Sequence, residues 1–157
     1  MTTNSLDQEM RIEENLVIID LDCEDWNCAI RKLADRLLAE NYIIEEFCNA
    51  VTTREHQYPT GLATEVPVAI PHTDSKYCKI PAIAVGILKY PILFGAMGGG
   101  DDVLVEMIFL MSVVNPQMQS KWVRRLVEFF RTPGELSKLK KSKNAIDVVN
   151  LLKNHIY

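Results

Sequence analysis

The chain has 157 residues, and its formal net charge of -4 comes from 21 acidic and 17 basic side chains. A chain of this length forms one domain and buries about 70% of the surface that its unfolded form exposes. The acidic balance argues against a nucleic-acid partner, because binding to a phosphate backbone needs a clustered excess of lysine and arginine. The lysines within 138–143 form one basic run, which is more typical of the solvated end of a helix.

The four cysteines are Cys23, Cys28, Cys48 and Cys78. They form no CxxC pair and have no histidine at the spacing of zinc ligands, so we expect reduced thiols and no bound metal. The first fifteen residues are polar and acidic, unlike a secretory signal peptide. The longest apolar run, 107–114, is too short to span a membrane. These features together predict a cytoplasmic protein.

The first third of the chain predicts a strand followed by two helices. Residues 1–14 are polar, and we expect them to be loosely held. The apolar run 16–21 predicts the strand, and Asp25 is a suitable N-cap for a helix over 26–39, whose apolar residues recur every three or four positions. A shorter helix over 44–54 carries Arg54 at its C-terminal end, where the helix dipole favours a basic side chain for purely structural reasons as well.

The middle of the chain predicts a turn and three strands. The sequence Tyr58-Pro59-Thr60-Gly61 is typical of a turn that folds the preceding helix end back toward the next strand. That strand covers 66–70 and ends at Pro71, which cannot donate to a sheet ladder. Later strands are predicted over 82–88 and 103–114, the second as a buried central strand.

The glycine-rich segment 95–100 separates these last two strands. It lacks the Gly-Lys-Ser/Thr ending of a phosphate-binding loop, and we interpret it as a mobile surface loop. Asn115-Pro116 opens an amphipathic helix, 132–135 matches a capping box with Pro133 at the first helical position, and a last helix starts at 144–147. Strands that alternate with helices predict an α/β fold, a three-layer α/β/α sandwich around one mixed sheet.

His72 follows directly after a predicted strand end. It has no cysteine or serine nucleophile in a recognisable elbow and no second histidine at metal-ligand spacing. A neutral imidazole, with a pKa of about 6.5, is itself a nucleophile at neutral pH, and phosphorus is its natural electrophile. Arg54 would then screen the phosphoryl oxygens, since a guanidinium suits them better than an ammonium does. The alternative interpretation is that His72 is only an exposed turn residue.

Four neighbouring residues are weaker candidates for the same site. Thr73 offers a hydroxyl, and either Asp74 or Glu55 offers a carboxylate that would orient the imidazole, with nothing in the sequence to choose between them. His56 would approach after the turn, although an exposed loop position is the simpler interpretation. Phosphoryl transfer needs mainly positioning and charge stabilisation, so no cofactor is expected.

Three segments together resemble the active-site signature of the IIA components of the bacterial phosphotransferase system, in the mannitol/fructose superfamily. They are Arg54-Glu55, Pro59-Thr60-Gly61 and Val68-Ala69-Ile70-Pro71-His72. The resemblance covers nearly the whole chain, and Asn115-Pro116-Gln117-Met118-Gln119 resembles the galactitol-specific IIA proteins in particular. Mannitol-type and fructose-type members usually have a second histidine where this chain has Gln119. The amide of Gln119 can still donate to a phosphate oxygen, but it cannot share a proton.

The resemblance implies a single IIA domain over 1–157 and a phosphotransferase activity. His72 would accept a phosphoryl group from phospho-HPr and pass it to a cysteine of a IIB protein, with Arg54 and Gln119 binding the phosphoryl group. The membrane IIC subunit would be an indirect partner, and galactitol or a related sugar would be taken up. An apolar docking surface is expected around His72, with Phe94 or Met97 contributing if the glycine-rich loop folds over the site. The alternatives are a regulatory protein similar to the nitrogen-related IIA proteins and a binding domain without transfer.

Overall fold

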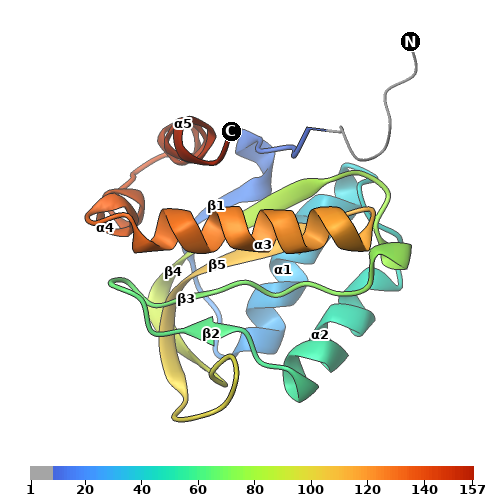
Figure 1. The fold of residues 1–157 in the computed structure, drawn as a ribbon, viewed down its shortest axis with the longest axis horizontal. Helices are drawn as coiled ribbons and strands as arrows, with labels where there is room; N and C mark the ends of the chain where they lie inside the picture. Colours follow the sequence, from blue (N-terminus) through green and yellow to red (C-terminus); the bar gives the residue numbers. More distant parts are fainter. Residues whose placement is uncertain (1–8) are drawn as a thin grey trace.

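The computed structural model describes residues 9–157, in which one sheet lies between two layers of helices (Figure 1). Its strands are β1 (Val17–Leu21), β2 (Gly61–Leu62), β3 (Val68–Ala69), β4 (Ala82–Phe94) and β5 (Val103–Ser112). They follow one another in the order β1-β4-β5-β3-β2. β4 runs antiparallel to β5, whereas β1 is parallel to β4 and β3 is parallel to β5. The predicted α/β sandwich around one mixed sheet is therefore confirmed.

The helices lie on both faces of this sheet. They are η2 (Glu14–Leu16), α1 (Trp26–Ala39), α2 (Phe47–Gln57), η3 (Ser75–Tyr77), α3 (Pro116–Arg131), α4 (Glu135–Lys140) and α5 (Ala145–Ile156). Helices α3, α4 and α5 cover one face, and α1 and α2 cover the other (Figure 1). Asp25, Asn115 and Asn144 cap α1, α3 and α5, each side chain accepting a hydrogen bond from the backbone N–H three residues later.

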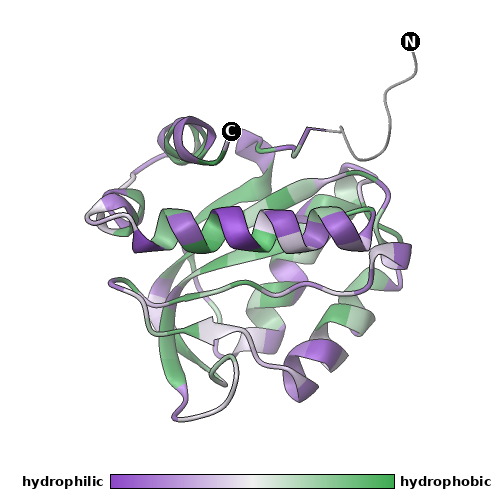
Figure 2. Cartoon of the chain, in the orientation of Figure 1, coloured by the Kyte–Doolittle hydropathy of each residue, from purple (hydrophilic) through white to green (hydrophobic). Residues whose placement is uncertain are grey.

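The two faces of the sheet build two hydrophobic cores. In β5, Phe109 packs into the core under α3, where its ring centroid lies 5.0 Å from that of Phe130. The adjacent Ile108 and Leu110 belong to the core under α1 and α2. Figure 2 shows the strands as predominantly hydrophobic and α3 as mixed, in keeping with a sheet covered on both sides. Burial on both faces explains why the central strand is a nearly continuous apolar run.

Residues 9–14 of the N-terminal segment pack against the rest of the domain. Residues 1–8 of the stretch predicted to be loosely held lie outside the described residues. For residues 9–14 the prediction is wrong, because Met10 and Ile12 are buried in the core. Between them, the Arg11 N–H donates to the Pro81 carbonyl and the Ile83 N–H donates to the Arg11 carbonyl. Alternation of apolar and polar residues, rather than the average polarity, decides the structure of this segment.

Two strands differ most from their predicted bounds, whereas β1 and β5 differ by one and two residues. The strand predicted over 66–70 is reduced to β3, which pairs antiparallel with the short β2 that the sequence did not reveal. β4 continues to Phe94, six residues beyond its predicted end, with a register shift between Ile87 and Ile92. Pro91 lies inside this irregularity, and it has no N–H to donate to the ladder.

The capping box predicted over 132–135 is wrong. Helix α4 begins at Glu135 after Gly134, whose φ of 83° is left-handed and suits glycine. The Thr132 hydroxyl instead donates to the Glu128 carbonyl at 3.1 Å, at the end of α3. The carboxylate of Glu135 is buried against His155, with 2.8 Å between Oε2 and Nε2, so it does not bond back to the helix start.

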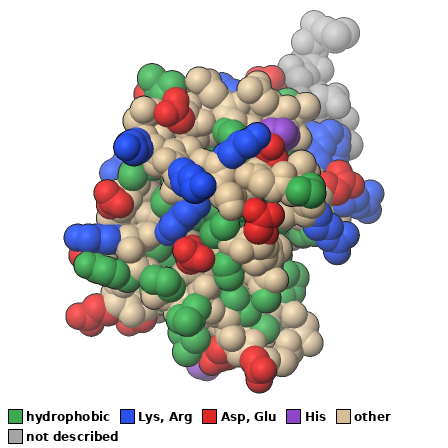
Figure 3. All heavy atoms as spheres, turned by 90° about the vertical axis from the view of Figure 1, so that its left-hand side faces the viewer, with side chains coloured by type: hydrophobic (Ala, Val, Ile, Leu, Met, Phe, Trp, Pro, Cys, Tyr) green, Lys and Arg blue, Asp and Glu red, His purple; other side chains and the backbone are tan. Residues whose placement is uncertain are grey.

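Exposed apolar side chains collect at the loop end of the β4–β5 hairpin. Tyr90, Leu93 and Leu104 are each more than half exposed, and Leu93 lies opposite Leu104 in the ladder. Figure 3 shows the side of the molecule that includes this end, with hydrophobic side chains gathered in the lower half of the view. Within residues 9–157, no helix combines the length and the apolar character needed to cross a membrane.

Candidate active site

The end of β3 places His72 as predicted, just beyond a strand. Ile70 is fully buried, and the Pro71 carbonyl accepts a hydrogen bond of 3.1 Å from the N–H of Met111 in β5. The backbone before His72 is therefore attached to the central strand, whereas the His72 side chain is only half-buried. The backbone of His72 is therefore held in place, while its side chain remains accessible to a partner protein.

A backbone carbonyl orients the imidazole of His72. Nδ1 lies 2.8 Å from the Ile70 carbonyl oxygen, and because that oxygen can only accept, a neutral ring must carry its proton on Nδ1. Nε2 is then left with a free lone pair. Burial lowers the pKa of His72, the positive charge of Arg54 lowers it further, and the bond to Ile70 acts in the opposite direction. The ring is therefore neutral and nucleophilic at neutral pH.

Arg54 reaches the same site from the last turn of α2. The helix continues to Gln57 instead of ending at Arg54 as predicted, and Arg54 is exposed. Its guanidinium carbon lies 5.4 Å from the centre of the Tyr58 ring, within the range of a cation–π contact. Arg54 and His72 line one cavity of about 690 Å³, so the structure brings the two predicted residues together.

The glycine-rich loop closes one side of this cavity. The Gly61 N–H donates to the Gly95 carbonyl at 3.0 Å, and the Met97 N–H donates to the Gly61 carbonyl at 2.8 Å. A β-carbon on Gly95 would lie 2.6 Å from Cγ of Pro59, so only glycine permits this approach. Met97 lines the cavity and is 38% exposed, whereas Phe94 is buried and its predicted role in docking is wrong. The first part of the loop thus has fixed partners.

Glu55 fastens the turn between α2 and β2. Its buried carboxylate accepts hydrogen bonds from the Thr60 N–H at 2.8 Å and from the Thr60 hydroxyl at 2.9 Å. Glu55 therefore does not orient the ring of His72, although it was one of the two carboxylates, with Asp74, that the sequence offered for that role. Burial raises the pKa of Glu55 to about 7, against the opposing effect of the two bonds to Thr60 and of Arg54. Glu55 is therefore a positioning residue that holds the turn between Arg54 and the cavity wall.

The variant Glu55→Gln is expected to flatten the dependence of stability on pH. Because the folded protein holds the Glu55 proton more strongly than the unfolded chain, this stabilisation is complete below the unfolded value of 4.5 and is lost as the pH rises through about 7. The loss amounts to about 3 kcal/mol for the wild type. Urea unfolding between pH 4.5 and pH 8 measures it, and parallel curves for wild type and variant would contradict the assignment.

A second cavity, of about 420 Å³, also borders His72. It is lined by His72, Gln119, Ser120, Val123, Arg124, Val127, Glu128 and Arg131. The Gln119 amide donates one hydrogen bond to the Thr73 carbonyl at 2.8 Å, which leaves its second N–H for another acceptor. Ser120 and Arg124 were not predicted. Their separation by one helical turn places them on one face of α3, but the sequence does not show which polar positions of that helix lie beside His72.

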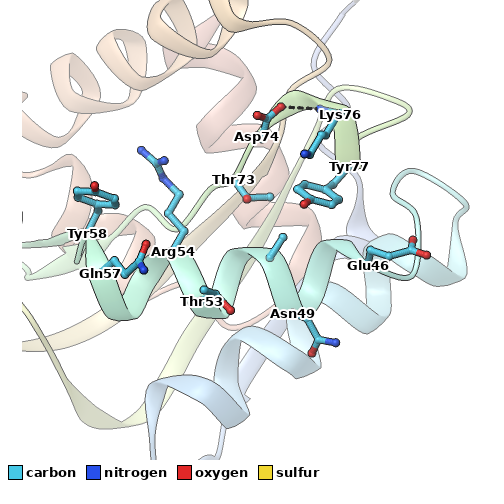
Figure 4. Close-up of a pocket in the computed structure, with 11 residues that line it drawn as sticks. Glu46, Asn49, Thr53, Arg54, Gln57, Tyr58, Thr73, Asp74, Lys76 and Tyr77 are labelled. Atoms are coloured by element: carbon cyan, nitrogen blue, oxygen red, sulfur yellow. Dashed lines mark hydrogen bonds between the residues drawn. The ribbon is translucent and has the colours of Figure 1, made fainter.

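The remaining candidates lie away from the two His72 cavities. Thr73 and Asp74 line a third cavity, of about 560 Å³, beside Arg54, and Figure 4 shows their side chains there. The Asp74 carboxylate accepts a hydrogen bond from the Lys76 N–H and so caps η3, and it does not bond to the His72 ring. His56 is exposed and lines a separate pocket with Trp26. The structure therefore brings none of these three side chains to the ring of His72.

The fold and the paired histidine and arginine agree with a family match over most of the chain. Residues 10–155 match the family described as the phosphoenolpyruvate-dependent sugar phosphotransferase system, EIIA 2. The protein belongs to this family, as the resemblance of its motifs predicted.

One relative by sequence and two solved structures show what this protein is similar to within and around this family. The galactitol-specific EIIA component of Escherichia coli (strain K12) is 28% identical over 110 residues, which are 69% of this chain and 73% of that protein. IIAMTL from Escherichia coli, solved in complex with phosphorylated enzyme IIBMTL, has a TM-score of 0.78 at 16% identity, covering 93% of this chain and 99% of that one. The nitrogen regulatory protein IIA-Ntr from Neisseria meningitidis has a TM-score of 0.71 at 20% identity, covering 89% and 94%. The two solved structures share the fold of this protein.

Proposed function

We propose that this protein is a cytoplasmic phosphocarrier whose His72 accepts a phosphoryl group from phospho-HPr and passes it to a cysteine of a IIB protein. The main observation in support is that the imidazole of His72 is oriented by the Ile70 carbonyl and shares a cavity with Arg54. The IIAMTL complex with phosphorylated IIBMTL supports a IIB acceptor. The galactitol-specific relative supports galactitol or a related sugar as the transported compound.

The proposed transfer occurs in two displacements at phosphorus. In the first, the Nε2 lone pair of His72 attacks the phosphorus of phospho-HPr, the new P–N bond forms and the P–N bond to the HPr ring breaks. In the second, a IIB thiolate attacks the phosphorus and the bond to Nε2 breaks. Nδ1 keeps its proton throughout, because the Ile70 carbonyl accepts from it.

Donors in both cavities that border His72 balance the charge on the transferring group. Arg54 lines the first cavity, and Gln119 lines the second. Both offer N–H donors to phosphoryl oxygens, and the charged guanidinium forms the stronger bonds. Val123 lines both cavities and Met97 lines the first, which provides an apolar surface for the two protein partners around the histidine. The membrane subunit IIC takes no direct part.

Reconstitution with phosphoenolpyruvate, Enzyme I and HPr tests the proposal. We expect one phosphoryl group per chain, located on His72 by peptide mass spectrometry and on Nε2 by the ³¹P chemical shift. Adding candidate IIB proteins, each with its IIC membranes and sugar, identifies the acceptor through sugar-dependent loss of the label. An unlabelled protein, or a label on another residue, would disprove the phosphocarrier assignment.

A regulatory role is the second candidate, and the likeness to the nitrogen regulatory protein IIA-Ntr is the observation that favours it. In that case the protein is labelled on His72 but keeps its label with every IIB protein and sugar tested. Its phosphorylation state then changes its affinity for other proteins. The IIB experiment described above separates the two functions.

The pH dependence of His72 provides a separate check. Because burial and Arg54 lower its pKa, the ring is expected to be protonated only below its ordinary value of 6.5. Phosphoryl acceptance should therefore begin to fall at a lower pH than it would with an ordinary histidine. Titration of the His72 ring by NMR measures the midpoint directly, and the Arg54→Ala variant should raise it. A wild-type midpoint above 6.5 would contradict the proposed environment.

A further inference from the structure

Two cysteines that the sequence did not pair lie side by side in the structure. Cys28, in the first turn of α1, donates a hydrogen bond to the sulfur of Cys23, with 2.8 Å between the two sulfurs. Both thiols are free and half-buried. Their separation of five residues in the chain is not that of a CxxC motif, so only the fold reveals the contact. The pair lies outside the cavities that His72 lines.

The geometry requires little movement to join these sulfurs. Disulfide-bonded sulfurs are about 2.05 Å apart, so the pair must approach by about 0.8 Å. Cys28 is fixed, because its backbone N–H donates to the Asp25 carboxylate at the helix start. Cys23 belongs neither to β1 nor to α1, and its backbone can therefore shift without breaking a ladder or helix hydrogen bond. Cys23 is thus the partner whose backbone is free of regular secondary structure and can move toward Cys28.

We propose that Cys23 and Cys28 are a redox modification site, which a hydroperoxide converts reversibly into an intramolecular disulfide. In the first step one sulfur is oxidised to a sulfenic acid and hydrogen peroxide is reduced, with release of water. The second sulfur then attacks the first, forming the S–S bond and breaking the S–O bond, and a second water leaves. Two thiols and one hydrogen peroxide thus give one disulfide and two waters. A dithiol reductant restores the thiols.

The surroundings of the two sulfurs indicate which cysteine hydrogen peroxide oxidises first. Burial, together with the hydrogen bond from Cys28, raises the pKa of Cys23 to about 11, although the ammonium of Lys32 acts in the opposite direction. Cys23 therefore stays protonated at neutral pH and reacts slowly with peroxide by itself. We expect Cys28 to be oxidised first and Cys23 to resolve the sulfenic acid.

Thiol counting on the full chain tests this proposal. After treatment with hydrogen peroxide and unfolding, the four free cysteines should fall to two, with a mass loss of roughly 2 Da and a peptide that links Cys23 to Cys28. Dithiothreitol should restore all four. In the Cys23→Ser variant the reaction should stop at a sulfenic acid on Cys28, which dimedone traps.

Cys48 and Cys78 provide matched controls. Their sulfurs contact other groups, the Arg31 guanidinium at 3.8 Å and the Asp74 carbonyl at 4.0 Å. The double variant Cys48→Ser, Cys78→Ser should still lose two thiols. The proposal is overturned if all four thiols survive in the wild type, if the disulfide includes Cys48 or Cys78, or if peroxide gives only sulfinic acids. These outcomes do not depend on the phosphocarrier function.

Discussion

Replacing His72 by glutamine is expected to abolish phosphorylation by phospho-HPr. Glutamine is neutral, polar and similar in size to histidine, so the half-buried position can accept it without loss of the local fold. It has no nucleophilic lone pair on nitrogen, and the initial rate of labelling should fall by more than ~10³-fold. The measurement is incorporation of ³²P from phosphoenolpyruvate through Enzyme I and HPr.

Two controls separate loss of the nucleophile from loss of structure. The variant His56→Gln makes the same substitution at an exposed position away from the His72 cavities, and it should be labelled like the wild type. Thermal unfolding of His72→Gln should remain cooperative. If a folded His72→Gln protein is still labelled, the phosphoryl group is carried by another residue.

Replacing Arg54 by alanine is expected to slow phosphoryl transfer by about 10²–10³-fold, the usual cost of removing one preorganised donor from a site of developing charge. Arg54 is exposed and forms no part of either core, so the fold should be retained. The loss should appear in the rate of transfer at saturating phospho-HPr. Arg54→Lys should recover only part of the rate, because an ammonium cannot form the two parallel bonds of a guanidinium.

The assay conditions matter for this variant. Removing Arg54 also raises the pKa of His72, since its positive charge lowers that pKa in the wild type. Rates should therefore be compared at pH 8, where the His72 ring is neutral in both proteins. Arg36→Ala, in α1 and outside the cavities that His72 lines, is the matched control and should be fully active. A decrease of less than about 5-fold in Arg54→Ala would remove Arg54 from the transfer step.

Local patterns in the sequence predicted much of the fold. The three-and-four spacing of apolar residues located α1 and α3, and Asp25, Asn115 and Asn144 marked helix starts. A proline after an apolar run placed His72 beyond a strand end. These signals act over a few neighbouring residues, which is why a single sequence carries them.

The sequence did not reveal features that depend on contacts between distant segments. β2 is only two residues long and forms by pairing with β3, so it has no periodicity of its own that the sequence could show. The partner of Glu55 could not be chosen, because it depends on how the turn at Thr60 folds back. The positions of Ser120 and Arg124 beside His72 depend on the rotation of α3 over the sheet. Each of these missed features is tertiary in origin.

The hydrogen bond between His72 and the Ile70 carbonyl also bears on the proposed phosphorylated state. With the phosphoryl group on Nε2, a ring that had lost its Nδ1 proton would direct a lone pair at the carbonyl lone pairs, which is repulsive. The carbonyl therefore favours a protonated, positively charged phosphoimidazole, whose ring departs as neutral imidazole. Because the acceptor is the main-chain carbonyl of Ile70, substitution of the Ile70 side chain does not remove it. The backbone at Ile70 therefore makes the imidazole a good leaving group.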